Sequence, residues 1–224
     1  MVVNTNLGGG KTDGVVSEKI NVDVNISSQG VITNTVTINR THNGIKGVQF
    51  TGRNNVNYVR LYVPKGSELL SASGFNIPDS SLFEIPEEGW TDDDDIKFAS
   101  DTLYIDDNTK TEIFEEEGKT VFGNWIQTSP GTTSTTTFTY KLPFTINLLE
   151  SEESITTKIQ NFIGFAKTGK YTLTIQKQSG IIDRDTNLTV NLPENVKTIW
   201  SSQNEESNSF TNKTDGFFAL LLER

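Results

Sequence analysis

Residues 118–143 read GKTVFGNWIQTSPGTTSTTTFTYKLP, and this stretch indicates the fold of the chain. Two runs rich in β-branched and aromatic residues flank a turn, in which Pro130 fixes φ and Gly131 accepts the positive φ that a type II turn requires. On the second run, large apolar residues alternate with threonine and lysine, which is the period of a half-buried strand. We therefore expect a β-hairpin at the centre of a sheet, with Trp125 and Phe138 in its core.

The same alternation recurs along the rest of the chain. Residues 19–26 and 31–38 alternate apolar and polar side chains on either side of a Gln-Gly turn, so they predict a second hairpin. Shorter alternating runs with turn residues between them bring the total to about ten to twelve strands. Alternation with polar residues is typical of antiparallel sheets that face solvent on one side. The sequence therefore predicts an all-β fold, an antiparallel, immunoglobulin-like β-sandwich.

We expect one domain over residues 1–224, with three segments outside the regular strands. Residues 1–14 are rich in glycine and predict an entry loop. Residues 76–117 carry three acidic clusters and a degraded alternation, which predicts a loop-rich insertion. In residues 145–168 the apolar side chains fall at helical spacing after a serine N-cap, so we expect one short helical insertion.

The composition excludes several classes of function. The chain has a net charge of -10, 29 acidic and 19 dispersed basic residues, so we expect no nucleic-acid partner and no insertion into an anionic membrane. It has no cysteine, which excludes disulfides and thiol chemistry. Neither a signal peptide nor a run of about 20 apolar residues is present. The chain is therefore either intracellular or an ectodomain separated from its anchor.

Common catalytic and cofactor motifs do not fit. Gly10-Lys11-Thr12 and Gly118-Lys119-Thr120 both lack the upstream glycine of a phosphate-binding loop. His42 is the only histidine, and no Gly-x-Ser-x-Gly elbow or second zinc ligand accompanies it. Because His42 lies beside an Asn-Gly turn, we expect a solvated side chain and no catalytic residue.

The acidic loops are compatible with one cofactor, calcium. Carboxylates from neighbouring loops are the hard oxygen ligands that this ion prefers, although the spacing matches no EF-hand. Runs of like charge are also typical of solvated loops that bind nothing. The candidate ligands are Asp92, Asp93, Asp94, Asp95, Asp106 and Asp107.

A second candidate site is a set of aromatic and cationic residues. Tyr58, Arg60 and Tyr62 fall on the side of a predicted strand opposite its apolar residues, and Trp90 lies among turn residues in the insertion. Tyrosine, tryptophan and arginine dominate binding hot spots, so these four residues are candidate binding residues. The alternative is that this face of the sheet is simply covered, either by the insertion at residues 76–101 or by the predicted helix.

Several phrases together resemble a known family. They are Val3-Asn4-Thr5-Asn6 with Gly9-Gly10-Lys11-Thr12-Asp13, residues 58–67 (YVRLYVPKGS), Gly118-Lys119-Thr120-Val121-Phe122, Tyr140-Lys141-Leu142-Pro143 and Lys177-Gln178-Ser179-Gly180. Their order resembles the C-terminal portion of a family of large, membrane-anchored bacterial envelope proteins of unassigned function. The family pattern has proline where this chain has Ser179. The resemblance implies an extracytoplasmic β-rich domain with its membrane anchor N-terminal to this chain, and it supplies no catalytic residues.

Two functions follow as expectations. The first is a non-catalytic β-sandwich module of the cell envelope or cell surface, serving attachment, spacing or recognition of a protein or glycan partner. The second is an envelope enzyme that acts on glycans, or its carbohydrate-binding accessory domain, in which Trp90 or Trp200 forms a platform for sugars. Glycoside hydrolysis would also require two carboxylates about 5–10 Å apart in a cleft.

Overall fold

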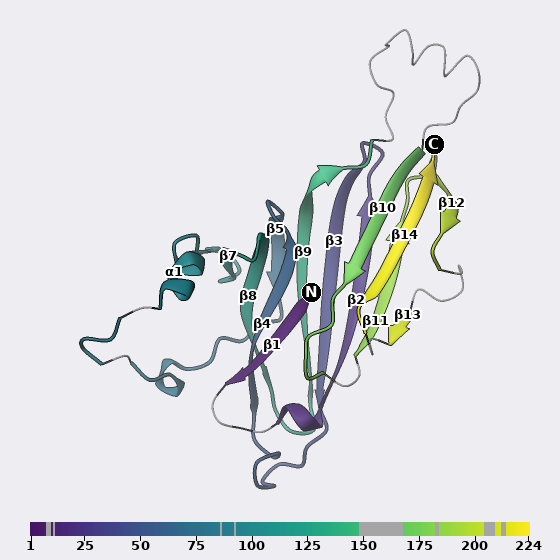
Figure 1. Cartoon of the computed structure of the whole chain (residues 1–224). Coiled ribbons are helices and arrows are strands. Elements are labelled where there is room, and N and C mark those ends of the chain that lie inside the picture. Colours follow the sequence, from purple (N-terminus) through teal and green to yellow (C-terminus); the bar gives the residue numbers. More distant parts are fainter. Residues whose placement is uncertain are drawn as a thin grey trace, which may run out of the picture.

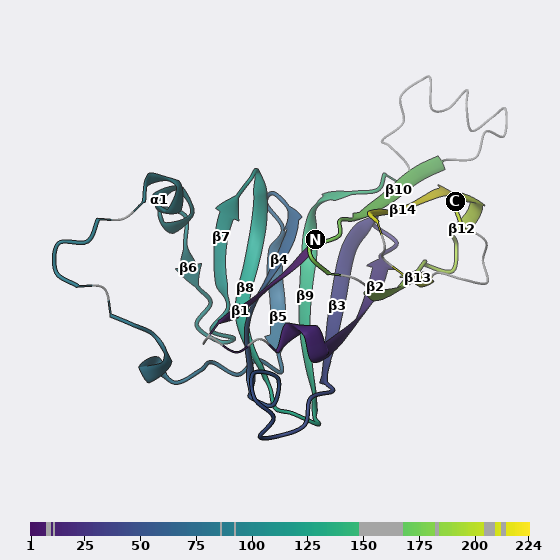
Figure 2. The same cartoon turned by 60° about the horizontal axis from the view of Figure 1, so that its bottom comes forward.

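The strands form three sheets arranged in two layers (Figure 1). This computed structural model describes residues 1–7, 10, 12–85, 87–91, 93–147, 168–181, 184–203, 209–211 and 214–224. The largest sheet, sheet B, forms one layer, and sheets A and C lie beside each other over its inner face (Figure 2). The predicted all-β sandwich is confirmed.

Sheet B has six strands. In order across the sheet they are β13 (Ser209–Thr211), β11 (Asp185–Asn191), β2 (Val16–Ile26), β3 (Val31–His42), β9 (Thr133–Thr145) and β5 (Glu68–Ser73). All neighbours are antiparallel except β11 and β2, which are parallel. The chain enters β11 after crossing from sheet C, and this crossover explains the one departure from the expected antiparallel pairing.

Sheets A and C complete the sandwich. Sheet A contains, in order, β1 (Val2–Leu7), β4 (Asn55–Pro64), β8 (Lys119–Thr128), β7 (Glu112–Glu116) and β6 (Tyr104–Ile105). Sheet C contains β10 (Thr168–Ile175), β14 (Gly216–Glu223) and β12 (Lys197–Ser201). The described helical elements are the α-helix α1 (Asp94–Ser100) and two short 3-10 turns, Asp13–Val15 and Ser80–Leu82.

The stretch 118–143 forms two strands, but the predicted hairpin is wrong. β8 and β9 lie in different sheets, joined by a corner at residues 129–132. β8 has no free edge for β9, because β4 pairs along one edge and β7 along the other. The corner is fixed to the end of β3, since the N–H of Gly131 donates to the carbonyl of His42 over 2.8 Å. Gly131 has the predicted positive φ, 77°.

The expected core position of Trp125 is also wrong, whereas that of Phe138 is confirmed. Phe122 and Ile126 are the apolar residues of β8 that pack into the core facing sheet B, and both are at most 1% exposed. Trp125, one residue out of phase, lies on the outer face of sheet A next to Tyr58. A one-residue change of parity moves a strand side chain to the opposite face, and size alone does not set parity.

The predicted hairpin of β2 and β3 is confirmed over eleven residue pairs. Gly30 ends its turn with a φ of 76°, and a Cβ atom there would lie 1.8 Å from the carbonyl oxygen of Ile146. Glycine is required at this position both for its φ and for the close approach of the chain after β9.

The inner and outer faces of sheet B differ as the alternation predicted. The inner face contributes apolar residues to a single core shared with sheets A and C. The outer face carries threonine pairs between β3 and β9, such as Thr35 with Thr139 at 3.1 Å and Thr41 with Thr133 at 2.8 Å between hydroxyl oxygens. Such cross-strand pairs stabilise a solvent-facing sheet.

Other segments depart from the expectations. The predicted entry loop 1–14 is wrong in its first half, because residues 2–7 form β1, an edge strand paired with β4. Strands β12 and β13 were not predicted. The insertion 76–117 contains α1 and returns to sheet A through β6 and β7. Most of the predicted helical insertion, 145–168, lies outside the described residues, so that helix stays a prediction.

Candidate functional site

The predicted binding residues Tyr58, Arg60 and Tyr62 lie side by side on the outer face of β4. The hydroxyl of Tyr58 donates to Oε2 of Glu112 over 2.5 Å, and the hydroxyl of Tyr62 donates to Glu116. Arg60 Nη1 lies 3.4 Å from the same Glu116 carboxylate. These contacts join β4 to β7 across β8, so the polar ends of the three residues already have partners within sheet A.

Both tyrosine hydroxyls are stabilised in their protonated form. Burial raises the pKa of Tyr58, and the hydrogen bond to Glu112 raises it further. Burial and the hydrogen bond to Glu116 raise the pKa of Tyr62 in the same way. A deprotonated phenol beside a carboxylate would repel it, so the two hydroxyls act as hydrogen-bond donors on this face.

Two residues that the sequence did not single out shape this face. Gly123 of β8 lies beneath Tyr58, and a Cβ atom there would come within 2.1 Å of the Tyr58 hydroxyl. The ring of Trp125 contacts Tyr58 at 4.9 Å and Phe83 at 5.2 Å between centroids. Phe83 comes from the insertion, which therefore covers part of the face, as the alternative interpretation expected. The sequence did carry a signal for Gly123, because a glycine inside a strand pattern often marks a place where another part of the protein comes close to the backbone.

Trp90 is not part of this cluster. It is 70% exposed, and among the described residues its ring contacts none of the aromatic residues of sheet A. It belongs to residues 76–105, here named the projecting segment, whose middle part with α1 extends away from the sheets (Figures 1 and 2). Phe83 contacts sheet A, and residues 104–105 return to it as its edge strand β6. The predicted binding residues therefore divide between two places.

The projecting segment exposes an unusual number of large apolar side chains. Nine of them are between 39% and 90% exposed: Ile77, Leu82, Phe83, Ile85, Trp90, Ile96, Leu103, Tyr104 and Ile105. The same segment has nine acidic residues and one basic residue, Lys97. Single exposed apolar residues are ordinary, but a concentration of them in one segment is typical of an interaction surface.

The predicted calcium ligands do not come together in the described part of the chain. Asp93 and Asp94 lie at the start of α1, whereas Asp106 accepts hydrogen bonds from the N–H and hydroxyl of Thr109 at 2.8 and 2.7 Å. Those bonds lower the pKa of Asp106 and stabilise its own turn. No group of three or more metal-binding side chains occurs among the described residues, which exclude Asp92 and the side chain of Asp95. Asp107 lies beside Asp106 in that turn.

The expectation that His42 is solvated is wrong. Its side chain is fully buried at the end of β3, where Nδ1 accepts from the N–H of Gly44 and Nε2 lies 2.9 Å from the carbonyl oxygen of Arg53. With Nδ1 accepting, Nε2 carries the proton and donates. Both nitrogens hold the loop between β3 and β4, so His42 has a structural role here.

An ionic cluster that the sequence did not reveal lies between the sheets. Glu18 of β2 pairs with Arg40 of β3 at 2.7 Å and with Arg184, just before β11, at 2.7 Å. All three side chains are at most 6% exposed. Asn4 of β1 donates to Glu18 over 2.9 Å, and Asn55 of β4 accepts from Arg40 over 3.2 Å. The cluster therefore joins sheets A and B.

Two further residues border the cluster. Asp13, whose side chain is 56% exposed, lies 3.4 Å from Arg40, and Gln178 exchanges two hydrogen bonds with the backbone of Asn4. A polar hollow opens beside it between the start of β2 and residues 178–181. The only sequence signal was that Glu18 and Arg40 fall on the inward parity of β2 and β3, next to the apolar residues Ile20 and Ile38. Arg184 precedes its strand, so no periodicity marked it.

Comparison with known proteins does not place the chain in a family. No family model and no curated protein matches the sequence. Among solved structures, an M1 zinc metallopeptidase from Deinococcus radiodurans is similar over 97% of this chain and 45% of its own, with 9% identity and a TM-score of 0.31. A mutant of that peptidase bound to a Tyr-Ser-Ala substrate gives 8% identity and a TM-score of 0.29.

The chain thus spans less than half of the peptidase it resembles. At these TM-scores the likeness carries no information about fold or activity. Within the described residues, no helix has the length and apolar character needed to cross a membrane.

Proposed function

We propose that this chain is a non-catalytic β-sandwich module of a bacterial cell envelope that recognises a protein partner through the projecting segment. The observation that carries the proposal is the concentration of nine exposed apolar side chains in residues 76–105. The resemblance to membrane-anchored envelope proteins supports an extracytoplasmic place. The acidic surface and the outer threonine face of sheet B support a protein that stays in solution without inserting into a membrane.

The charge of the projecting segment defines the partner's chemistry. With nine acidic residues against one basic residue, the segment fits an apolar groove with a basic rim. Trp90 and Ile85, which are 70% and 90% exposed, are the side chains best placed to enter such a groove. Binding should weaken as salt rises, because salt screens contacts between exposed charges.

Two matched variants test this function. Trp90→Ser removes an exposed tryptophan from the projecting segment, and Trp200→Ser removes one, 56% exposed, from β12 at the other side of the molecule (Figure 1). Immobilised wild-type protein and Trp200→Ser should retain the same envelope protein from an extract, and Trp90→Ser should lose it. Loss with both variants, or with neither, would contradict recognition through the projecting segment.

A glycan array with the same two variants separates the alternative function. The alternative has support in the exposure of Trp90 and Trp200, since sugars stack on exposed aromatic rings. The two tryptophans lie in different parts of the molecule, so they cannot form one platform. Binding of a glycan that Trp90→Ser abolishes would replace the protein partner with a carbohydrate.

A further inference from the structure

The loop between β3 and β4, residues 43–54 and here named the basic loop, exposes a second group of large apolar side chains. Three of them are between 47% and 74% exposed: Ile45, Val48 and Phe50. The loop also carries two exposed basic residues, Lys46 and Arg53, and no acidic residue, although the whole chain has a net charge of -10. A concentration of exposed apolar side chains is typical of an interaction surface.

Internal hydrogen bonds fix the backbone of the basic loop. The N–H of Gly52 donates to the carbonyl of Val48 over 2.9 Å, and the N–H of Gly47 donates to the carbonyl of Gly52 over 3.2 Å. A Cβ atom at Gly52 would lie 2.2 Å from the carbonyl oxygen of Ile45, so the two limbs of the loop are in close contact. The buried His42 closes its base. A surface that is fixed before binding loses little conformational entropy when a partner docks.

Phe50 has a backbone conformation that its side chain does not favour. Its φ is 67°, in the left-handed region, where a bulky residue is an outlier and asparagine or glycine is common. Its side chain is 57% exposed, so packing in the core does not offset this strain. A strained and exposed aromatic residue therefore indicates a role in binding.

The basic loop and the projecting segment have complementary surfaces. Both expose large apolar side chains, and their charges are opposite, since the segment has nine acidic residues and one basic residue. In the segment, Glu87 and Glu88 are exposed and close in sequence to Trp90. Each surface thus combines apolar side chains with charges that attract the other. Because both sets of side chains are exposed, the two surfaces do not cover each other within one chain.

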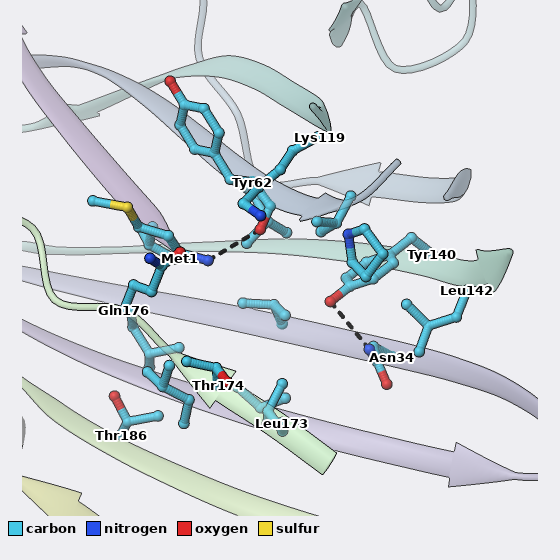
Figure 3. A pocket seen from close by; sticks show the side chains of 18 of the residues that line it. Met1, Asn34, Tyr62, Lys119, Tyr140, Leu142, Leu173, Thr174, Gln176 and Thr186 are labelled. Atoms are coloured by element: carbon cyan, nitrogen blue, oxygen red, sulfur yellow. Dashed lines mark hydrogen bonds between the residues drawn. The ribbon is translucent and has the colours of Figure 1, made fainter. Parts of the chain in front are cut away.

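Other apolar regions fit the projecting segment less well. The cavity of about 340 Å³ between β4, β9 and β10 (Figure 3) is lined by core residues such as Leu61 and Leu142, which are at most 7% exposed and offer little surface to a second chain. On β12, the exposed Trp200 lies near Lys197, but Lys197 is already paired with Glu223 at 2.6 Å.

An anionic membrane is another surface that attracts an apolar and basic loop. Two cations attract such a membrane only weakly, and it repels a chain whose net charge is -10. The acidic projecting segment of a second copy is therefore the better match in charge.

We propose that the basic loop of one copy docks on the projecting segment of the next, so that copies of this chain join head to tail. Phe50 packs against Trp90, and Lys46 and Arg53 pair with the acidic residues beside it. The two surfaces lie at different places on the molecule, with the loop at the bottom of Figure 1, so a dimer leaves one of each free and assembly continues. This inference rests on the proposed function, because it names the partner that the projecting segment recognises.

Sedimentation velocity of the whole chain over a range of concentrations tests the assembly. The wild type should form dimers and larger species as its concentration rises, and added salt should reverse this. Phe50→Asn should keep the melting temperature, because asparagine tolerates the positive φ, and should weaken association at least tenfold. Trp90→Ser should weaken it equally, and Trp200→Ser should assemble like the wild type. A wild type that is monomeric at every concentration, or assembly that Phe50→Asn retains, would overturn the proposal.

A mixture of the two weakened variants tests the pairing of the surfaces. Phe50→Asn keeps an intact projecting segment, and Trp90→Ser keeps an intact basic loop. An equimolar mixture should therefore form dimers and nothing larger, at concentrations where each variant alone is monomeric. A mixture that stays monomeric would contradict the head-to-tail contact.

The same variants separate this inference from the proposed function. If the wild type stays monomeric but retains an envelope protein that Trp90→Ser loses, the second copy is the wrong partner and the proposed function stands. If Trp90→Ser assembles and retains the extracted protein like the wild type, both are wrong. Binding of the wild type, but not of Phe50→Asn, to vesicles that contain phosphatidylserine would assign the basic loop to a membrane and overturn the proposal.

Discussion

Two polar clusters connect strands in this protein, and they differ in how much the fold depends on them. The interior cluster of Glu18, Arg40 and Arg184 is at most 6% exposed and lies between sheets. The outer cluster, in which Tyr58 and Tyr62 donate to Glu112 and Glu116, lies on the open face of sheet A. A buried charge that loses its partner is costly, whereas a surface group can turn to water. The interior cluster should therefore determine stability, and the outer face should tolerate change.

Alkaline titration should break the outer cluster together with the whole fold. Burial raises the pKa of Tyr140 to about 12 and also raises those of Tyr58, Tyr62 and Tyr171, against about 10 in an unfolded chain. A raised folded pKa contributes stability that is complete below about pH 10 and is lost as the pH rises toward the folded value.

Absorbance at 295 nm should show four of the five tyrosines ionising together with the loss of circular dichroism. Reversible ionisation of all five near pH 10 with the sheets intact would contradict the burial of these rings.

Glu18→Gln should have the largest effect of any single change to the two clusters. It keeps the shape of the side chain and leaves Arg40 and Arg184 without their shared carboxylate, so we expect a loss of about 3–5 kcal/mol in the free energy of unfolding. The matched change in the outer cluster, Glu116→Gln, should cost about 0–1 kcal/mol. Urea denaturation of both variants measures the difference, and equal losses would mean that burial does not separate the clusters.

Gly123→Ala should disturb the outer cluster by an intermediate amount. The new methyl group would displace the Tyr58 ring from its place over β8 and break its bond to Glu112, at a cost of about 1–3 kcal/mol. Gly14→Ala is the control, because a Cβ atom at Gly14 meets open space and φ is not positive there. A stability equal to the wild type for Gly123→Ala would show that Tyr58 has another position of similar energy.

Of the changes considered, added calcium should have the smallest effect on stability. The described acidic residues of the insertion do not gather, and Asp106 is bonded within its own turn. The melting temperature in millimolar calcium should therefore equal that in the same concentration of magnesium. A rise specific to calcium would restore the predicted site at residues 92–95 and 106–107.

Much of the fold could be predicted, because strand alternation reports which face of a sheet a residue occupies. The positions of Phe138, Tyr140 and Leu142 in the core followed from a period of two, since such a strand buries one face. The hairpin of β2 and β3 followed from its turn. The sequence could not show that β8 and β9 lie in different sheets, because a turn between two strands is compatible with both a hairpin and a corner between sheets.

The candidate sites were less predictable, since they depend on contacts between distant segments. The sequence marked Tyr58, Arg60, Tyr62 and Trp90 as binding residue types, but it could not show that the first three meet Glu112 and Glu116 while Trp90 lies apart. The residues around the cavity between β4, β9 and β10 carry no shared motif, because they come from strands far apart in the sequence and, as Arg184 does, from positions outside a strand.

By itself, the sequence determined that the chain forms a two-layered β-sandwich with an acidic insertion, because side-chain periodicity and charge are local properties. Only the tertiary structure decided which strands share a sheet, where the charges of Glu18, Arg40 and Arg184 are neutralised, and where a cavity remains. These features arise from the packing of segments far apart in the sequence, as in the hydrogen bond from Arg184 to the Val2 carbonyl, 182 residues away, and local periodicity carries no information about them.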